Sequence, residues 1–475
     1  MRINIPLAKT LGRGASKAAG MQSLTNMYLE PISNDGRARF AAYGSPGRTL
    51  FSTIGGGTVR GQIRAGDMHY AVIGTGFYLI PATGIETNMG FVEGTALVDM
   101  SFNGVQLDIV AETKAYSFDT ISLAFAEITE ANFEAASSVS SVASYSIYVV
   151  KNTGRFRWRL VNTPTFSADD FATAEAEADV LVAIRKVGNQ IAMLGSTSLE
   201  WWQPTGDAGA LAFGKTQVAA ASIGCLSRDA AIVVNNALYF VGRDGRAGGA
   251  SVYRATGYSP EKISTPQVDY YLEQLPDISQ LHALTHQELG HQFLVLTATN
   301  ELSLALDIET GVWTFRKSGQ WSMGAEPTGG WDAVTFALNG NKQIIGAADG
   351  NLYELDHEVY TELGNGIIRE ITLPQIHTEG RRSFMSRLEV DIEAGVGLIT
   401  GQGSDPTVMA SFSDDGGQTW SPPRNASLGA TGQTKYRAFW LACGSFRQRI
   451  IKLRVSDPVK FAVVGVYADV ETAGH

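Results

Sequence analysis

The chain has 475 residues, of which 44% are hydrophobic and 18% charged, a composition typical of a folded globular protein rather than a disordered one. Its 37 basic and 47 acidic residues give a formal charge of −10, which argues against a protein that coats DNA phosphates with a basic face. This length predicts more than one domain.

Two cysteines, Cys225 and Cys443, lie far apart in apolar surroundings. We predict two buried, reduced thiols, and neither a disulfide framework nor a metal site. No apolar run reaches the roughly 18 residues of a membrane-spanning helix, and the first twenty residues lack the apolar centre of a secretory signal. We therefore expect no membrane-spanning segment.

Residues 1–45 are predicted to form an N-terminal arm followed by an irregular or strand-like entry segment at Thr25–Pro31. The first twenty residues contain Arg2, Lys9, Arg13 and Lys17 and no acidic residue. Two interpretations stay open here. One is a solvated, flexible arm, and the other is an arm that docks on a neighbouring protein.

Residues 46–360 repeat one short sequence pattern: an apolar strand, a Gly- or Asn-rich turn and a second strand. Copies start roughly 40–55 residues apart, which is the period of propeller blades. A lone hairpin is marginal in water, so the units must pack around an axis. The pattern predicts an all-β fold with a β-propeller of six or seven blades, seven being favoured. The repeats are His69–Ile80, Leu107–Phe118, Tyr145–Trp158, Ile191–Trp202, Ala237–Tyr253, Gln292–Leu306 and Gln343–Leu355.

Two stretches interrupt this pattern. Thr120–Ala143 is rich in Ala, Ser and Glu, and we expect it to include a short helix. Ser167–Ala178 offers an N-cap at Ser167 and acidic residues in the following turns, so it is predicted to be a short helix or a loop between blades.

The repeated pattern ends near residue 360. Residues 361–475 are predicted to form a separate C-terminal β-domain resembling a β-sandwich. Strand spacing alone leaves open whether the first of these strands closes the propeller instead. The expected strands are Ile367–Ile376, Ser386–Ile392, Val408–Phe412, Thr434–Trp440, Arg449–Val455 and Lys460–Val470.

The sharpest local motif is an Asp-box, Ser-x-Asp-x-Gly-x-Thr-Trp, formed by Ser413, Asp415, Gly417, Thr419 and Trp420. Its chemistry is structural: the carboxylate accepts backbone N–H groups in a tight turn, and the tryptophan covers the hairpin. Sialidases carry several such boxes, but they also need an arginine cluster and a Tyr–Glu pair. The motif therefore favours a stabilised hairpin over a glycan site.

Other motifs do not predict a catalytic, cofactor or metal site. His286 and His291 are five residues apart rather than the four of a zinc helix, and Gly290 interrupts them. The glycine-rich run 242–249 lacks the Gly-Lys-Ser/Thr ending of a phosphate loop. Trp201 and Trp202 suggest a glycan platform, but strand neighbours alternate faces, so one of the two rings is expected to point into a blade core.

Short segments spread over most of the chain resemble those of the packaged-DNA stabilisation proteins of short-tailed bacteriophages, also called tail accessory or tail nozzle proteins. Their order and spacing together carry the resemblance. The segments are Asn26–Tyr28, Ser45–Gly47, Asp170–Glu175, Gly195–Trp202, Gly206, Ile223–Cys225, Leu238–Arg243, Val252–Tyr258, Lys262–Thr265, Gly290–Leu296, Asp307–Trp313, Arg387–Val390 and Ser413–Gly417.

The resemblance implies a homo-oligomer, expected to be a hexameric ring, below the portal and its adaptor and above distal tail needle or spike proteins. Double-stranded DNA passes through the lumen without sequence-specific binding, and the ring helps to retain and then release the genome. The resemblance implies no catalytic residue and no cofactor. It places the protein, made in the host cytoplasm, in the virion tail.

Two rival classes of function stay open from the sequence. One is a carbohydrate-binding or sialidase-like propeller that acts in host receptor recognition, which clustered arginines or acids beside exposed tryptophans would favour. The other is a soluble propeller scaffold for cellular partners. The two are separable from a tail ring by the mass of the chain in solution.

Overall fold

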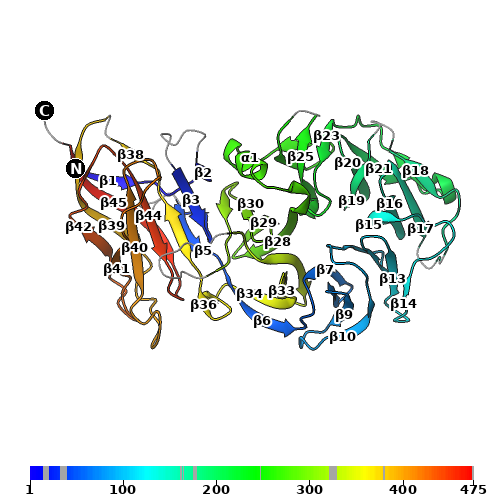
Figure 1. The fold of residues 1–475 in the computed structure, drawn as a ribbon, viewed down its shortest axis with the longest axis horizontal. Helices are drawn as coiled ribbons and strands as arrows, with labels where there is room; N and C mark the ends of the chain where they lie inside the picture. The colour runs from blue at the N-terminus through cyan, green and yellow to red at the C-terminus, as the bar shows by residue number, and fades with distance from the viewer. Residues whose placement is uncertain are drawn as a thin grey trace.

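A computed structural model of the chain describes residues 1–13, 21–32, 40–160, 163, 165–174, 179–245, 248–319, 329–377 and 380–472. The chain forms two β-sheet units that lie side by side along the longest axis, a propeller and a sandwich (Figure 1). The first strand of the chain, β1, and its last strand, β45, both lie in the sandwich, at the end of the molecule furthest from the propeller (Figure 1).

Within the described residues, the propeller has seven blades arranged around an axis (Figure 1). Blade 1 is β7 (Val59–Ala65), β8 (Met68–Ile73), β9 (Gly76–Ile80) and β10 (Thr87–Phe91). Blade 2 is β11 (Asp99–Phe102), β12 (Gln106–Val110), β13 (Ala115–Asp119) and β14 (Phe125–Glu127). Blade 3 is β15 (Ala136–Val142), β16 (Tyr145–Val150), β17 (Arg155–Leu160) and β18 (Phe171–Thr173). Blade 4 is β19 (Leu181–Val187), β20 (Gln190–Gly195), β21 (Leu199–Pro204) and β22 (Phe213–Lys215).

The remaining blades follow the same plan with local additions. Blade 5 is β23 (Ile223–Cys225), β24 (Ile232–Val234), β25 (Ala237–Asp244), β26 (Ser251–Ala255) and β27 (Glu261–Lys262), followed by the helix α1 (Pro266–Glu273). Blade 6 is β28 (His282–Glu288), β29 (His291–Ala298), β30 (Leu302–Asp307) and β31 (Trp313–Phe315). Blade 7 is β32 (Ala333–Asn339), β33 (Lys342–Ala347), β34 (Asn351–Asp356) and β6 (Gly47–Thr53). The seven hairpins expected from the sequence are the second and third strands of the seven blades, so the propeller prediction is confirmed.

Blade 7 closes the propeller with a strand from far away in the chain. Strand β6 pairs antiparallel with β34, from Gly47 opposite Asp356 to Thr53 opposite Asn351. The innermost strands of blades 7 and 1, β32 and β7, pack against each other and complete the ring. The first strand after residue 360 therefore does not close the propeller.

The two stretches that interrupt the repeat are strands and turns where the structure describes them. Between residues 120 and 143 lie a turn and the whole of β14 and β15, because these residues supply the outer edge of blade 2 and the inner edge of blade 3. Strand β18 occupies part of 167–174, while 175–178 lie outside the described residues. The helix expected in each stretch is wrong for these residues, since pairing with a blade edge overrides weak helical propensity.

The sandwich consists of two sheets. One contains β1 (Arg2–Ile5), β4 (Met27–Pro31), β5 (Phe40–Gly44), β39 (Ser383–Ile392), β42 (Ala438–Leu441), β43 (Ser445–Phe446) and β45 (Ala462–Thr472). The other contains β2 (Gly12–Arg13), β3 (Met21–Thr25), β37 (Arg369–Thr372), β38 (Ile376–His377), β40 (Thr407–Ser413), β41 (Arg424–Ser427) and β44 (Gln448–Val455). Short strands β35 (Thr361–Glu362) and β36 (Asn365–Gly366) extend the sheet of blade 7.

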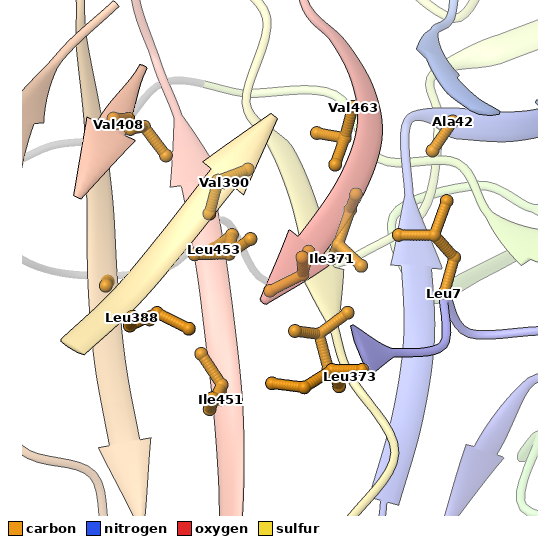
Figure 2. Packing of buried hydrophobic residues seen from close by; sticks show 14 of the residues in the cluster. Leu7, Ala42, Ile371, Leu373, Leu388, Val390, Val408, Ile451, Leu453 and Val463 are labelled. Atoms are coloured by element: carbon orange, nitrogen blue, oxygen red, sulfur yellow. The ribbon is translucent and has the colours of Figure 1, made fainter. Parts of the chain in front are cut away.

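Aliphatic side chains fill the space between the two sheets of the sandwich. Figure 2 shows Leu388, Val390 and Val463 on one side, and Ile371 and Leu453 on the other, meeting in one core. Each of these side chains is buried, and burial of one such side chain contributes about 1.5–3 kcal/mol. The C-terminal sandwich expected from the sequence is confirmed.

The first 45 residues are not an arm where the structure describes them. Strand β1 pairs with β45 from Arg2 opposite Asp469 to Ile5 opposite Val466, and β3 pairs with β37. Leu7 packs in the sandwich core, and Lys17 lies outside the described residues. We keep residues 1–45, 46–360 and 361–475 as a proposed division of the chain, with the first segment contributing strands to the sandwich.

Candidate functional site

The axis of the propeller is a polar cavity of about 330 Å³. Its lining comes from the innermost strands of all seven blades, which bring residues far apart in sequence to one place. Representative lining residues, one from each blade in order, are Gln62, Asp99, Ser140, Arg185, Val233, Ala283 and Thr335.

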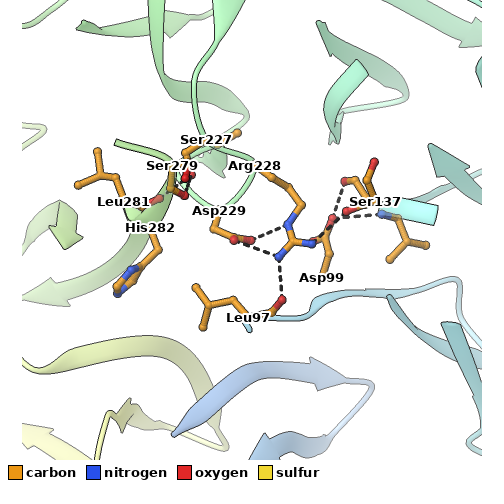
Figure 3. A network of polar contacts seen from close by, with 12 residues as sticks. Leu97, Asp99, Ser137, Ser227, Arg228, Asp229, Ser279, Leu281 and His282 are labelled. Carbon is orange, nitrogen blue, oxygen red and sulfur yellow. Dashed lines mark hydrogen bonds and ion pairs between the residues drawn. The ribbon is translucent and has the colours of Figure 1, made fainter. Parts of the chain in front are cut away.

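Arg228 ties several blades together beside this cavity (Figure 3). Its guanidinium pairs with Asp229 at 2.7 Å and donates to the carbonyl oxygens of Ser137 at 3.0 Å and Leu97 at 2.8 Å. Ser137 lies in β15 of blade 3 and Leu97 in the segment leading into blade 2, whereas Arg228 lies in blade 5. The side chain therefore bridges three blades.

Arg185 of blade 4 completes the same network. It pairs with Asp99 at 3.0 Å and donates to the carbonyl oxygens of Ala231 at 2.7 Å and Arg228 at 2.9 Å. Burial opposes ionisation of Asp99, but Arg185 and Arg228 outweigh it and hold the pKa of this carboxyl below its usual value. Arg185 and Arg228 are thus engaged in holding blades together.

A single asparagine joins the propeller to the sandwich. Asn26 donates from Nδ2 to the carbonyl oxygens of Lys317 and Ile368, each at 2.9 Å, and accepts from the Lys317 N–H at 2.9 Å. Its φ is 51°, a left-handed conformation that asparagine tolerates. Next to it, Thr25 and Phe315 form a parallel bridge, so the sheet of blade 6 continues into a sheet of the sandwich.

We call this connection between the propeller and the sandwich, made by Asn26 and the Thr25–Phe315 bridge, the joint. Buried charged side chains surround it. Arg48 pairs with Asp332 at 2.6 Å, and the Arg316 guanidinium lies over the Trp331 ring at 4.5 Å. Burial raises the pKa of Glu288 to about 8, although Arg316 and Arg369 act against this shift. A carboxyl group with this pKa is largely protonated at neutral pH, which lowers the cost of burying it.

A second polar cavity, of about 400 Å³, lies beside the joint and is lined by Glu288, His291 and Glu309 among others. His291 contacts Asp307 at 2.8 Å through Nδ1. Asp307 also accepts from the Glu309 N–H and from Thr310 Oγ1, as in a capped turn. The pair therefore holds the turn between β30 and β31. Among the described residues that line the cavity there is no Ser, Thr, Cys or Lys.

Two family models match the chain. The first is described as the β-propeller of bacteriophage P22 Gp10 and matches residues 3–360, and the second is the β-sandwich of the same protein and matches residues 368–471. The chain belongs to the bacteriophage P22 Gp10 family. This is the packaged-DNA stabilisation, or tail nozzle, family, so the resemblance read from the sequence is confirmed and the protein is a structural component of a virion tail.

Several solved structures are similar to part of this Gp10 family member at low sequence identity. The Neurospora crassa Pan2 WD40 domain is 9% identical with a TM-score of 0.42, covering 65% of this chain and 95% of that one. The N-terminal domain of Nup159 is 11% identical with a TM-score of 0.42, covering 70% and 98%. The designed Ika8 protein is 11% identical with a TM-score of 0.38, covering 64% and 99%. No curated protein matches the chain.

In this Gp10 family member the Asp-box lies in the sandwich, between β40 and β41. Asp415 accepts from the N–H groups of Gln418 at 2.9 Å and Thr419 at 3.0 Å and from Thr419 Oγ1 at 2.6 Å, while Ser413 Oγ accepts from the Gly417 N–H at 2.8 Å. Hydrogen bonds from Thr419 and its neighbours lower the pKa of Asp415. Lys452 Nζ lies over the Trp420 ring at 4.4 Å. A purely structural role for the box stays a prediction.

The remaining sequence candidates lie apart from one another. His286 is buried and stacks on Phe293, whereas His291 contacts Asp307. Trp201 and Trp202 are both buried, in clusters on opposite faces of blade 4, because a blade is covered on both sides. Residues 246 and 247 of the glycine-rich run lie outside the described residues.

In the described part of the chain, no group of three or more His, Cys, Asp and Glu side chains is placed to hold a metal ion. Cys225 and Cys443 are buried and unpaired, and burial raises the pKa of the Cys225 thiol to about 12. Across the same residues, no helix has the length and apolarity to cross a membrane.

Sequence reasoning missed Asn26, Arg185 and Arg228 as joining residues. Asn26 stood in one of the segments that carried the family resemblance, which was the only signal available for it. Arg185 and Arg228 had no local signal, because their partners in other blades lie from 43 to 131 positions away in the chain.

Proposed function

We propose that the chain is a subunit of a nozzle ring, expected to be hexameric, that continues the DNA channel below the portal and adaptor of a short-tailed phage. In this ring it helps to retain the packaged genome and then to release it. The observation that carries the proposal is the match of both units, from residue 3 to residue 471, to a phage tail protein.

The architecture of the propeller supports a DNA path between subunits rather than through a blade axis. The axial cavity has a volume of about 330 Å³, and Arg185 and Arg228 bridge blades beside it. A DNA duplex is too wide for such a cavity. The channel is therefore formed by several copies around a common axis.

A conduit of this kind requires no catalytic step and no cofactor. The formal charge of −10 fits a weakly interacting bore, because strong neutralisation of phosphates would hold the DNA instead of letting it slide. DNA contacts in the lumen are then not specific for sequence. The portal and adaptor lie on one side of the ring, and tail needle or spike proteins on the other. The chain is made in the host cytoplasm before it joins the tail.

The test is to add the purified chain to portal–adaptor complexes and to particles that lack it, since a ring can require the preceding tail component as a template. Electron microscopy and the protein stoichiometry should show complete rings at the portal vertex, and DNA leakage should fall to that of complete particles. An unrelated acidic propeller, added at the same concentration, is the control.

Binding as single copies, or only at the distal tip together with glycan hydrolysis, would contradict the proposal. That result would instead support the alternative of a carbohydrate-binding propeller. If rings form but DNA leakage does not fall, the chain is a tail component whose role is not genome retention.

A further inference from the structure

The charges of this chain are divided between its two units. Residues 46–360 contain 19 Lys and Arg against 33 Asp and Glu, a formal charge of −14, whereas residues 1–45 and 361–475 together contain 18 against 14, a formal charge of +4. The sandwich and the propeller lie at opposite ends of the long axis (Figure 1). The molecule therefore has a basic end and an acidic end.

Exposed apolar side chains stand at the far edge of the sandwich, on β39 and on β42, the last strand of its sheet. Phe384 is 48% exposed, Phe439 43% and Leu441 55%. Arg387 lies opposite Leu441 in the strand register, and its guanidinium stands 4.7 Å from the Phe439 ring centre. Aromatic residues and arginine are the residue types enriched in protein interfaces.

Further arginines surround this patch and contact neutral oxygen atoms. Arg382 donates to Ser445 Oγ, Arg424 to the Leu441 carbonyl oxygen at 2.7 Å, and Arg447 to the Gly380 carbonyl oxygen at 2.5 Å. All three side chains belong to exposed residues. Each guanidinium has five N–H donors, so donors remain for a carboxylate. We call this surface the arginine edge: Arg382, Arg387, Arg424, Arg447, Phe384, Phe439 and Leu441.

The opposite end of the molecule carries an acidic and apolar surface on blades 3 and 4. Asp169 and Asp207 are exposed, and Gly209 places blade 4 beside Asp170 of blade 3. The nearby cations Arg155 and Arg157 are paired with Glu134. We call this surface the acidic rim: Asp169, Asp170, Asp207, Leu160, Phe171 and Leu211, of which Leu160, Phe171 and Leu211 are exposed hydrophobic residues.

We propose that the arginine edge of one copy docks on the acidic rim of blades 3 and 4 of the next copy. Opposite charges bring the two surfaces together, and the apolar side chains of both become buried. Two different patches at opposite ends of a subunit make a heterologous contact, which generates a ring when the rotation closes. This inference rests on the proposed ring and names the surfaces that build it.

Charge reversal tests the contact. The edge variant is Arg382→Glu with Arg424→Glu, and the rim variant is Asp169→Lys with Asp207→Lys. Each variant alone should lose ring formation on portal–adaptor complexes, with an association constant lower by roughly tenfold or more. Mixed in equal amounts, the two variants should form rings again, because the reversed edge of one then faces the reversed rim of the other.

The matched control is Arg64→Glu with Lys151→Glu, which reverses two propeller cations outside both surfaces and should leave ring formation unchanged. Thermal unfolding of every variant checks that the fold is retained. If the edge variant and the rim variant each form rings as wild type does, the docking contact is overturned while the proposed function still stands. Loss in each variant without recovery in the mixture would also overturn it. Absence of rings from wild type itself would contradict the proposed function and the inference with it.

Discussion

Asp415 and Asn26 each hold a stretch of backbone that most side chains would leave without partners. Asp415 collects the N–H groups of the turn that follows β40, and Asn26 joins blade 6 to the sandwich while adopting a left-handed conformation. In both cases a short polar side chain replaces hydrogen bonds that regular strand pairing cannot supply. Their contributions can be measured separately.

Replacing Asp415 with alanine should lower the melting temperature by about 2–4 °C and reduce assembly, because two backbone N–H groups and two hydroxyl groups lose their acceptor. The folded pKa of Asp415 is depressed, so its contribution is present above the unfolded value of about 3.9 and is lost as the pH falls below it. Asp67→Ala, at an exposed turn, is the control. An unchanged melting temperature together with lost glycan hydrolysis would contradict a structural role.

Replacing Asn26 with alanine should destabilise the protein by about 3 kcal/mol, since it removes three hydrogen bonds and places alanine, which tolerates the left-handed region less well than asparagine, at φ 51°. Denaturant unfolding measures this change. Asn26→Gly keeps the backbone conformation and should recover the part of the loss that comes from strain. Equal stability of the alanine variant and wild type would show that the joint does not depend on this residue.

At the scale of elements, closure of the propeller depends on one strand pair. Strand β6 comes from before the first blade and pairs with β34 of the last, so the ring of blades is held by a contact between residues about 300 positions apart. Blades 1 to 6 are each built from a continuous segment. The β6–β34 pair is therefore the place where the propeller can open.

A disulfide across this pair should stabilise the whole propeller. Thr49 lies opposite Glu354, and both native cysteines are buried elsewhere, so Thr49→Cys with Glu354→Cys can form one new bond. A crosslink that encloses so long a loop should add about 2–4 kcal/mol. Thermal unfolding of the oxidised protein, compared with the same protein after reduction, measures the gain. A bond that forms without raising the melting temperature would show that unfolding starts elsewhere.

At the scale of the whole molecule, the two units are joined through a sheet and a set of buried charges. Glu288, Arg316 and Arg369 lie near one another at this joint. Burial lowers the pKa of the Arg369 guanidinium to about 10 and raises that of Glu288 to about 8. The joint therefore makes stability depend on pH.

Glu288 should reduce stability as the pH rises. Its folded pKa lies above its unfolded value of about 4.3, so its stabilising effect is complete below that pH and is lost as the pH approaches 8. The difference in unfolding free energy between Glu288→Gln and wild type should therefore shift in favour of the variant by up to roughly 4 kcal/mol as the pH rises from 4.5 to 8. Denaturant titrations across this range measure it, with exposed Glu301→Gln as the control. Parallel curves for Glu288→Gln and wild type would contradict the shift.

The sequence alone determined the local units of the fold. Each blade hairpin is a pair of strands separated by a short turn, so alternation and turn residues within about a dozen positions predict it. The same locality explains the Asp-box, whose donors and acceptor span residues 413–419. The order of short segments identified the family. The helix expected at Thr120–Ala143 was wrong because its residues serve as blade edges. Of the helix or loop expected at Ser167–Ala178, the described residues 167–174 form a loop and the edge strand β18.

Only the tertiary structure decided how these units close and join. Strand β6 completes blade 7, β1 completes the sandwich, and Arg228 reaches carbonyl oxygens of two other blades. Trp201 and Trp202 are both buried because blade 4 is covered on both faces. Periodicity records which side of a strand is apolar but not which distant strand will cover it. Such pairings gain their free energy only when segments hundreds of residues apart meet, so no local pattern in the chain encodes them.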